Sequence, residues 1–289
     1  MPQTLLILVD GLGLGPAGPD NPLTGGRFRE LEAILAAAVP VDASMGVPGR
    51  PQSATGQTAL ITGCNAARAL GMHKEGFPNA ELKRIIQQHN VFRRLKERGY
   101  RCAFANAYYL RDRGGRLDTR RISVTTAATL AGIGWVRDEA YMERGEAVYQ
   151  DVTRELLRAR GYDGPVISEK QAASDLVRIA GRHDFTLFEY FQTDIAGHSC
   201  DRQRAEQVLG ILDRFLAGVR RGCRESGLLL VLISDHGNIE DLGCSTHTLN
   251  PVPLFAEGPD AHRLRSGVRR LEELVPVLLE LYPPRDPGI

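Results

Sequence analysis

Acidic residues follow three strand-like apolar runs in this sequence. The runs are LLILV (residues 5–9), FTLFEYF (185–191) and LLLVLI (228–233), and the acids within three residues of their ends are Asp10, Asp194 and Asp235. The carboxyl ends of parallel strands meet at one edge of a sheet, where open α/β folds bind ligands. A single Asp after a strand is also an ordinary turn former. Three carboxylates at one edge repel one another, so together they predict a bound divalent cation.

Three of the seven histidines lie beside these acids or in a loop close behind them. His236 directly follows Asp235, His198 lies four residues after Asp194, and His247 lies in the segment STHTLNPVP. Mixed carboxylate and imidazole ligands suit zinc, manganese or iron better than calcium, and they are typical of hydrolytic two-metal sites. The pattern therefore predicts a site for one or two such ions.

The segment RPQSATGQTALITG (residues 50–63) offers a candidate nucleophile, Ser53 or Thr55. The residues after Gly56 read as the start of a helix. A hydroxyl at a helix N-terminus lies near backbone N–H groups that bind anions, and a nearby metal ion would lower its pKa. A helix-capping Ser or Thr gives the same pattern, so the segment is a weak signal by itself.

The elements that must position these residues alternate between strand and helix. The apolar runs are nearly continuous, as in strands buried on both faces of a parallel sheet. A further strand is expected over residues 100–109. Helices are expected over residues 80–98, over 204–222 with Gly222 as the stop, and over 268–282 with an interruption or late start at Pro276. This alternation predicts an α/β fold around a mostly parallel central sheet.

Residues 108–163 differ from the rest of the chain. They include the polar, glycine-rich segment LRDRGGRLDTRR and an amphipathic pattern over residues 146–161 that predicts a helix. We expect residues 1–107 and 164–289 to form the catalytic core. Residues 108–163 would then form a small inserted cap or an extended loop region.

Composition narrows the class of protein. The 289 residues are 43% hydrophobic, which suffices for a substantial core, and the net charge of +1 gives no global field for nucleic acid or membranes. The five cysteines contain no CxxC pair, so we expect reduced thiols and a cytoplasmic protein. The sequence leaves the oligomeric state open.

Four blocks in this order resemble the alkaline phosphatase superfamily, and above all its branch of cofactor-independent phosphoglycerate mutases and phosphopentomutases. They are LVDGLG with Asp10, QSATGQT with Ser53, TDIAGHS with Asp194 and His198, and SDHGNIED with the following STHTLNPVP, which hold Asp235, His236 and His247. The last block is the most specific. The resemblance covers roughly residues 1–75 and 180–260.

This resemblance implies an α/β/α sandwich with two divalent metal ions, zinc or manganese. One ion would be held by Asp194, His198 and His247, and the other by Asp10, Asp235, His236 and the nucleophile oxygen. The nucleophile would be Ser53, with Thr55 as the second choice. It would attack the phosphorus of a small phosphorylated substrate and form a phospho-enzyme.

Two departures from the mutases favour a phosphatase or related phosphoester hydrolase. Gln57 stands where the mutases have a His after the Gly of the nucleophile loop, and the chain has room only for a short insert. The alternatives are a phosphomutase and a non-catalytic relative that binds metal or phosphate. His73 and Lys74 are expected as substrate contacts. The arginines of the insert would grip a second anionic group or form a solvated basic face; they are Arg111, Arg113, Arg116, Arg120 and Arg121.

Overall fold

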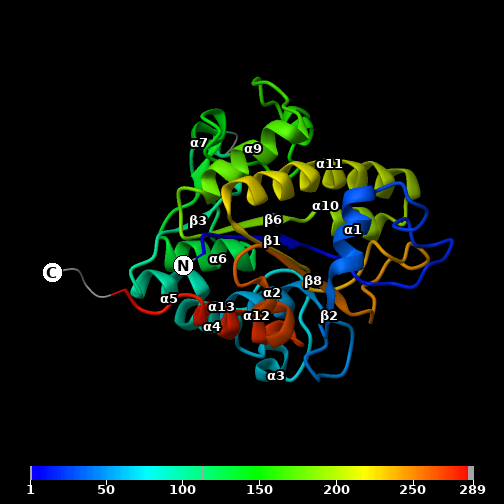
Figure 1. The fold of residues 1–289 in the computed structure, drawn as a ribbon, viewed down its shortest axis with the longest axis horizontal. Coiled ribbons are helices and arrows are strands. Elements are labelled where there is room, and N and C mark those ends of the chain that lie inside the picture. Colours follow the sequence, from blue (N-terminus) through cyan, green and yellow to red (C-terminus); the bar gives the residue numbers. More distant parts are fainter. Residues whose placement is uncertain (1, 112–113, 286–289) are drawn as a thin grey trace.

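The computed structural model describes residues 2–111 and 114–285, and its centre is a six-stranded sheet in the order β2-β8-β7-β1-β6-β3 (Figure 1). Strand β1 pairs in parallel with β6 and β7, and β3 pairs in parallel with β6. Strand β8 runs antiparallel to β7. The strands are β1 (Thr4–Val9), β2 (Val39–Val41), β3 (Cys102–Phe104), β6 (Phe185–Tyr190), β7 (Leu229–Ile233) and β8 (Val252–Glu257). The predicted mostly parallel α/β fold is confirmed.

Helices cover both faces of this sheet (Figure 1). One layer consists of α1 (Arg29–Ala37), α9 (Glu169–Ala180), α10 (Gln192–Ser199) and α11 (Arg202–Ser226). The other layer includes α2 (Ser53–Thr62), α3 (Ala66–Leu70), α4 (Ala80–His89), α5 (Val91–Glu97), α6 (Val124–Gly132), α12 (Ala261–Gly267), the 3₁₀ helix η2 (Leu271–Glu273) and α13 (Leu274–Glu280). Side chains of β1 alternate between the two cores: Leu6 and Leu8 pack into one, and Leu5, Ile7 and Val9 into the other. The expected α/β/α sandwich is therefore present.

The predicted end of the long helix at Gly222 is wrong. Helix α11 continues to Ser226 and ends at Gly227, which has a φ of 67°. Gly222 lies inside the helix, where an added Cβ would stand 2.9 Å from Cγ2 of Val177 in α9. This glycine therefore allows α9 and α11 to approach closely and does not terminate the helix.

Three other expected elements are divided or begin later than predicted. Asn90 ends α4 and begins α5, where its side chain accepts the backbone N–H of Arg93. The expected strand over residues 100–109 splits into β3 and β4 (Ala107–Tyr108), and β4 pairs with β5 (Arg137–Asp138) outside the main sheet. The C-terminal helix starts late, and Pro276 is the third residue of α13, where no helical hydrogen bond needs its nitrogen.

The helix predicted over residues 146–161 is wrong, because only α8 (Glu155–Arg158) is helical there. The carboxylate of Asp151 accepts the backbone N–H groups of Arg154 and Leu156, at 2.8 and 2.6 Å, and holds a loop instead. Elsewhere in the segment, α6 packs on α4 and α5, and α7 (Glu139–Glu143) belongs to a small separate apolar cluster. The division of residues 108–163 from the core stays a prediction.

Two further expectations concern membranes and thiols. Within the described residues, each helix is too short or too polar to traverse a lipid bilayer. All five cysteines are unpaired. The cytoplasmic location stays a prediction.

Glu257, the last residue of β8, forms ion pairs with Arg220 and Arg224 of α11, and these give a stability prediction with a defined pH range. Although burial would raise it, hydrogen bonds from Arg220 and Arg224 lower the pKa of Glu257 to about 2. A carboxyl with a lowered pKa stabilises the fold above its unfolded value of 4.5 and loses this contribution as the pH falls towards 2. We expect Glu257→Gln to lower the free energy of unfolding by about 1–2 kcal/mol at pH 7.

Urea unfolding at several pH values measures this effect, with Glu225→Gln on the exposed side of α11 as the control. The difference between the wild type and Glu257→Gln should shrink steadily as the pH falls from 4.5 towards 2. A difference that stays constant over that range would show that the charge of Glu257 has no part in it.

Candidate metal centre

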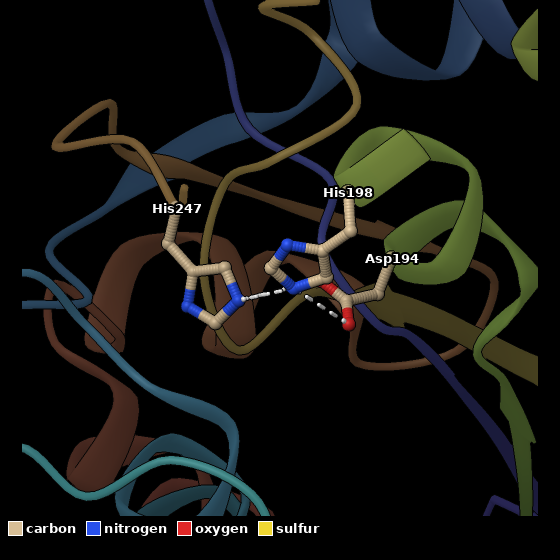
Figure 2. A group of neighbouring side chains, drawn as sticks. All are labelled: Asp194, His198 and His247. Atoms are coloured by element: carbon tan, nitrogen blue, oxygen red, sulfur yellow. Dashed lines mark hydrogen bonds and ion pairs between the residues drawn. The ribbon is translucent and has the colours of Figure 1, made fainter. Parts of the chain in front are cut away.

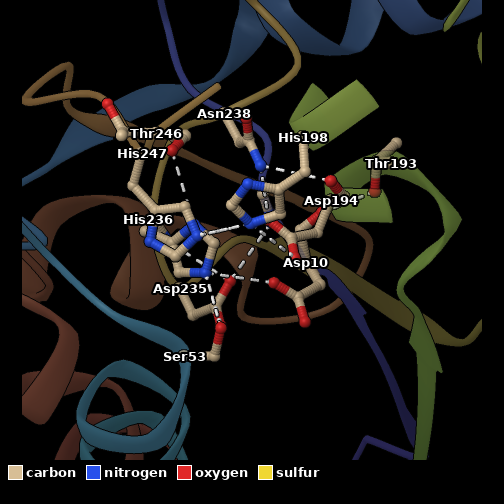
Figure 3. A network of polar contacts seen from close by, with 12 residues as sticks. Asp10, Ser53, Thr193, Asp194, His198, Asp235, His236, Asn238, Thr246 and His247 are labelled. Atoms are coloured by element: carbon tan, nitrogen blue, oxygen red, sulfur yellow. Dashed lines mark hydrogen bonds and ion pairs between the residues drawn. The ribbon is translucent and has the colours of Figure 1, made fainter. Parts of the chain in front are cut away.

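The three acids predicted at strand ends converge at one edge of the sheet (Figure 3). Asp10 directly follows β1, and Asp235 is the second residue after the neighbouring parallel strand β7. Asp194 lies in the first turn of α10, directly behind β6, which is the other neighbour of β1. His236 and His247 come from the loops that follow β7. The predicted ligands, separated by more than 200 residues in the sequence, therefore share one site.

Asp194, His198 and His247 form a first cluster (Figure 2). Their spacing in α10 places Asp194 and His198 one helical turn apart, with 3.4 Å between Oδ2 and Nε2. The Nε2 atom of His247 lies 3.5 Å from Asp194 Oδ1 and 3.1 Å from His198 Nε2. One carboxylate and two imidazole nitrogens therefore point to a common position.

The hydrogen bonds of the two imidazoles determine which nitrogens carry protons. His247 Nδ1 lies 2.9 Å from the carbonyl oxygen of Pro51, and His198 Nδ1 lies 2.8 Å from that of Ser245. A carbonyl oxygen only accepts, so each Nδ1 must donate. In the neutral rings, both Nε2 atoms then present lone pairs to each other. A cation between them removes this conflict, and carbonyl-bound Nδ1 atoms are usual for metal-binding histidines.

Asp10, Asp194 and His236 form a second cluster around the hydroxyl of Ser53. His236 Nε2 lies 2.9 Å from Ser53 Oγ, 3.2 Å from Asp10 Oδ1 and 3.6 Å from Asp235 Oδ2. Asp194 belongs to both clusters. The resemblance assigned it to one site only, whereas the geometry puts its carboxylate between the two positions.

The charges of this centre are poorly satisfied by the protein itself. Within the described part of the chain, Asp10 Oδ1 and Asp235 Oδ2 are buried without a hydrogen-bond partner, and the nearest imidazole nitrogen is His236 Nε2, at 3.2 and 3.6 Å. Burial, followed by repulsion from Asp235, raises the pKa of Asp10 well above its usual value. Although burial would lower it, Asp235 and Asp10 raise the pKa of His236 to about 10. Burial opposes ionisation of Asp194 too, but its contact with His247 and the charge of His236 hold its pKa at about 2. Such a buried set of donors fits divalent cations.

Glu240 holds three of the surrounding loops together, a role that the sequence did not reveal. Its Oε2 accepts the backbone N–H groups of Gly13 and Asn238, both at 2.8 Å. Its Oε1 accepts bonds from Thr248 at 2.5 Å and from Asn250 at 3.1 Å. The sequence signal for Glu240 was its position in the block SDHGNIED, in which only Asp235 and His236 were predicted to be functional. Asn238 of the same block donates to Asp194 Oδ1 at 2.7 Å.

Gln57 and Glu189 complete the floor of the site. Gln57 Nε2 donates to Asp10 Oδ2 at 3.0 Å, so the residue that departs from the mutase pattern contacts a candidate ligand. Thr125 donates to Glu189 Oε2 at 2.6 Å, and burial raises the pKa of Glu189 to about 7. Glu189 was overlooked because it lies inside an apolar run. A carboxylate within such a run was the available signal.

The two candidate nucleophiles occupy different surroundings. Ser53 is the first residue of α2, faces His236 and lines a cavity. Thr55 is fully buried, where its Oγ1 donates to the Gln52 carbonyl and accepts the backbone N–H of Lys74. The geometry favours Ser53 and gives Thr55 a structural part.

The cavity next to Ser53 has a volume of about 510 Å³. His73 and Lys74 are not among its lining residues, and His73 Nε2 instead lies 3.1 Å from the Val47 carbonyl. Their assignment as substrate contacts stays a prediction that this cavity does not support.

The five arginines of the insert have different surroundings. Arg121 lines the cavity, Arg111 and Arg120 are in ion pairs, Arg116 is exposed, and Arg113 lies outside the described residues.

Gly56 in α2 keeps the helix that carries Ser53 close to β7. An added Cβ would lie 2.8 Å from the carbonyl oxygen of Asp235. We expect Gly56→Ala to lower the free energy of unfolding by about 1–3 kcal/mol, because the backbones must separate.

Denaturant unfolding measures this loss, with Gly210→Ala as the matched control. Gly210 also lies in a helix, but its added Cβ would meet the flexible end of the Arg214 side chain at 3.3 Å and Cε1 of Phe28 at an ordinary contact distance of 3.9 Å. That control should gain up to about 1 kcal/mol from helix propensity. Equal stability changes in the two variants would contradict the close contact at Asp235.

Comparisons with known proteins agree with this geometry. Residues 159–277 match the Metalloenzyme superfamily, and they include five of the candidate ligands: Asp194, His198, Asp235, His236 and His247. Relatives named 2,3-bisphosphoglycerate-independent phosphoglycerate mutase include one from Myxococcus xanthus, 30% identical over 47% of this chain, and one from Cereibacter sphaeroides, 35% identical over 40%. The matched segments are only 29% and 24% of those two proteins' own lengths.

Solved structures share the fold over nearly the whole chain. The alkaline phosphatase of the Antarctic bacterium TAB5 has a TM-score of 0.58 at 12% identity, covering 97% of this chain and 98% of that one. Phosphoglycerate mutase of Leishmania mexicana has a TM-score of 0.54 at 12% identity, covering 99% and 96%. Residues 159–277 therefore match a Metalloenzyme-superfamily domain, the chain as a whole has an alkaline-phosphatase-like fold, and the relatives are named 2,3-bisphosphoglycerate-independent phosphoglycerate mutases. The resemblance found in the sequence is confirmed.

Proposed function

We propose that this protein is a two-metal-dependent phosphatase that acts through a phosphoserine at Ser53. The observation that carries this proposal is the position of the Ser53 hydroxyl. It lies 2.9 Å from His236 Nε2, beside the two candidate metal clusters and at one end of the cavity. A hydroxyl that lines a cavity beside carboxylates and imidazoles is placed for attack on a phosphoryl group.

The residues of the two clusters fit a pair of divalent ions, zinc or manganese. Asp194, His198 and His247 would hold one, and Asp10, Asp235 and His236 with Ser53 the other, with Asp194 between them. When bound, these ions would lower the pKa of the Ser53 hydroxyl and offset the negative charge of the phosphoryl group.

The protein's own groups orient the reaction. Ser53 begins α2, whose N-terminal backbone N–H groups favour negative charge nearby. Gln57 and Asn238 hold Asp10 and Asp194 by hydrogen bonds. In the first step, the Ser53 hydroxyl gives up its proton and its oxygen bonds to phosphorus, while the ester bond breaks and the leaving alcohol oxygen takes up a proton. In the second, water gives up a proton and displaces the Ser53 oxygen from phosphorus, which releases inorganic phosphate and restores the Ser53 hydroxyl.

A phosphomutase is the second candidate function, because the matched relatives are named phosphoglycerate mutases. It would share the first step and pass the phosphoryl group to another hydroxyl of the same substrate. Gln57 at the position of the mutases' histidine and the short segment 108–163 favour water as the acceptor.

Phosphorus NMR over a panel of phosphomonoesters separates the functions. The panel includes an aryl phosphate, 3-phosphoglycerate and a pentose 1-phosphate, each with protein loaded with Mn²⁺ or Zn²⁺ and each repeated with a chelator. A phosphatase gives inorganic phosphate, and a mutase gives an isomer of the substrate. Both functions require metal, so the chelator should abolish the product, whether it is inorganic phosphate or an isomer. No product with either metal would support a non-catalytic relative.

A further inference from the structure

The cavity at Ser53 extends well beyond the space of a phosphoryl group. The cavity has a volume of about 510 Å³. Asp10, Ser53 and Asp194 form one part of its lining, and residues within 104–110, 117–126 and 149–160 form much of the rest. Pockets of about 300–1,000 Å³ hold ligands of drug size. The alcohol part of a phosphomonoester therefore has room for more than a few carbon atoms.

Six of the residues that line the cavity are aromatic. They are Phe77, Phe104, Tyr108, Tyr109, Tyr149 and Phe191. Two of the large apolar side chains at the cavity are open to solvent: Phe77 is 43% exposed and Ile195 is 39% exposed. Rings pack well against other rings, and exposed apolar surface at a cavity is surface that a ligand can cover.

The cations of these walls already contact other groups. Among the described lining residues away from the metal centre, Arg121 and Arg160 are the cations and Asp118 is the anion, whereas Glu189 belongs to the floor of the site beside Gln57. The Arg121 guanidinium lies 5.0 Å from the centre of the Phe77 ring, and Arg160 donates to the Tyr149 hydroxyl at 3.2 Å. Both cations thus contact aromatic side chains. A second phosphate or carboxylate on the substrate would call for cations that are not already in such contacts.

We propose that this cavity is the leaving-group subsite for phosphomonoesters whose alcohol carries an aromatic ring, and that Phe77 covers that ring. The proposal rests on the proposed function, because it takes Ser53 as the reacting group. The ring of the alcohol would lie among the aromatic walls, with the phosphoryl group at Ser53.

Two phosphonates that differ only in the ring provide the test. Propylphosphonate and phenylpropylphosphonate resist hydrolysis, so calorimetry on the Mn²⁺-loaded protein measures binding without turnover. We expect the ring to tighten binding at least about tenfold, as burial of an aromatic ring should. Equal affinities would overturn the proposal, and so would undetectable binding of both compounds.

Phe77→Ala localises the effect. It should reduce the advantage of the ring at least about threefold and leave propylphosphonate unchanged. The control is Met72→Ala, because Met72 is 60% exposed and lies outside the cavity lining. A ring preference that Phe77→Ala does not alter would remove Phe77 from the subsite. A protein that prefers the ring but hydrolyses no ester would contradict the proposed function alone.

Discussion

Ser53→Ala should reduce turnover of an aryl phosphate by about 10³-fold or more, while the protein keeps its metal. The substitution removes the only atom proposed to bond to phosphorus. The carboxylates and imidazoles around it remain, including His236, whose Nε2 lies 2.9 Å from Ser53 Oγ in the wild type. Steady-state kinetics and elemental analysis of the same preparation measure both quantities.

Thr55→Val is the matched control for this experiment. Thr55 lies two residues further along α2, and both hydrogen bonds that its Oγ1 makes with the described residues are to backbone groups, the Gln52 carbonyl and the Lys74 N–H. Removing that hydroxyl should cost about 1 kcal/mol of stability and leave turnover within a few-fold of the wild type. Full activity in Ser53→Ala, or a collapse of activity in Thr55→Val alone, would transfer the nucleophile to Thr55.

Asp194→Asn should remove most of the bound metal and reduce turnover by more than about 100-fold. The Asp194 carboxylate lies 3.4 Å from His198 Nε2 and 3.5 Å from His247 Nε2, and it also belongs to the cluster of Asp10 and His236. Because it is shared, its loss should lower the content of both ions. Elemental analysis after dialysis against trace metal measures the content per chain.

Asp163→Asn provides the comparison, because the Asp163 side chain is 90% exposed and its ion pair with Arg111 is long, at 3.9 Å. Its metal content and turnover should equal those of the wild type. An Asp194→Asn protein that loses only one ion would show that the carboxylate serves one cluster, as the sequence resemblance implied.

The sequence predicted the sheet and most of the candidate site because both depend on local patterns. Buried parallel strands are continuous apolar runs, and the turn after each strand carried Asp10, Asp194 or Asp235. Parallel topology then brings strand ends together whatever their distance along the chain. The histidines followed from their closeness in sequence to these acids.

Other features depend on tertiary contacts that a sequence pattern does not contain. Gly222 resembles a helix stop, but it accommodates Val177 of the neighbouring helix. The amphipathic pattern of residues 146–161 predicts a helix, but the hydrogen bonds of Asp151 hold a loop there instead. Glu189 was overlooked because it lies within an apolar run. To predict that Asp194 belongs to both clusters, one would need the three-dimensional positions of three separate loops.

The most direct test of the central claim is to trap the phosphoryl group on Ser53. The metal-loaded protein is mixed with an aryl phosphate, quenched in acid during turnover, digested and examined by mass spectrometry. The account predicts phosphoserine at Ser53 in the peptide that contains the N-terminus of α2, and its absence in Ser53→Ala. Sustained turnover with that peptide unmodified, or with phosphate on Thr55, would contradict it.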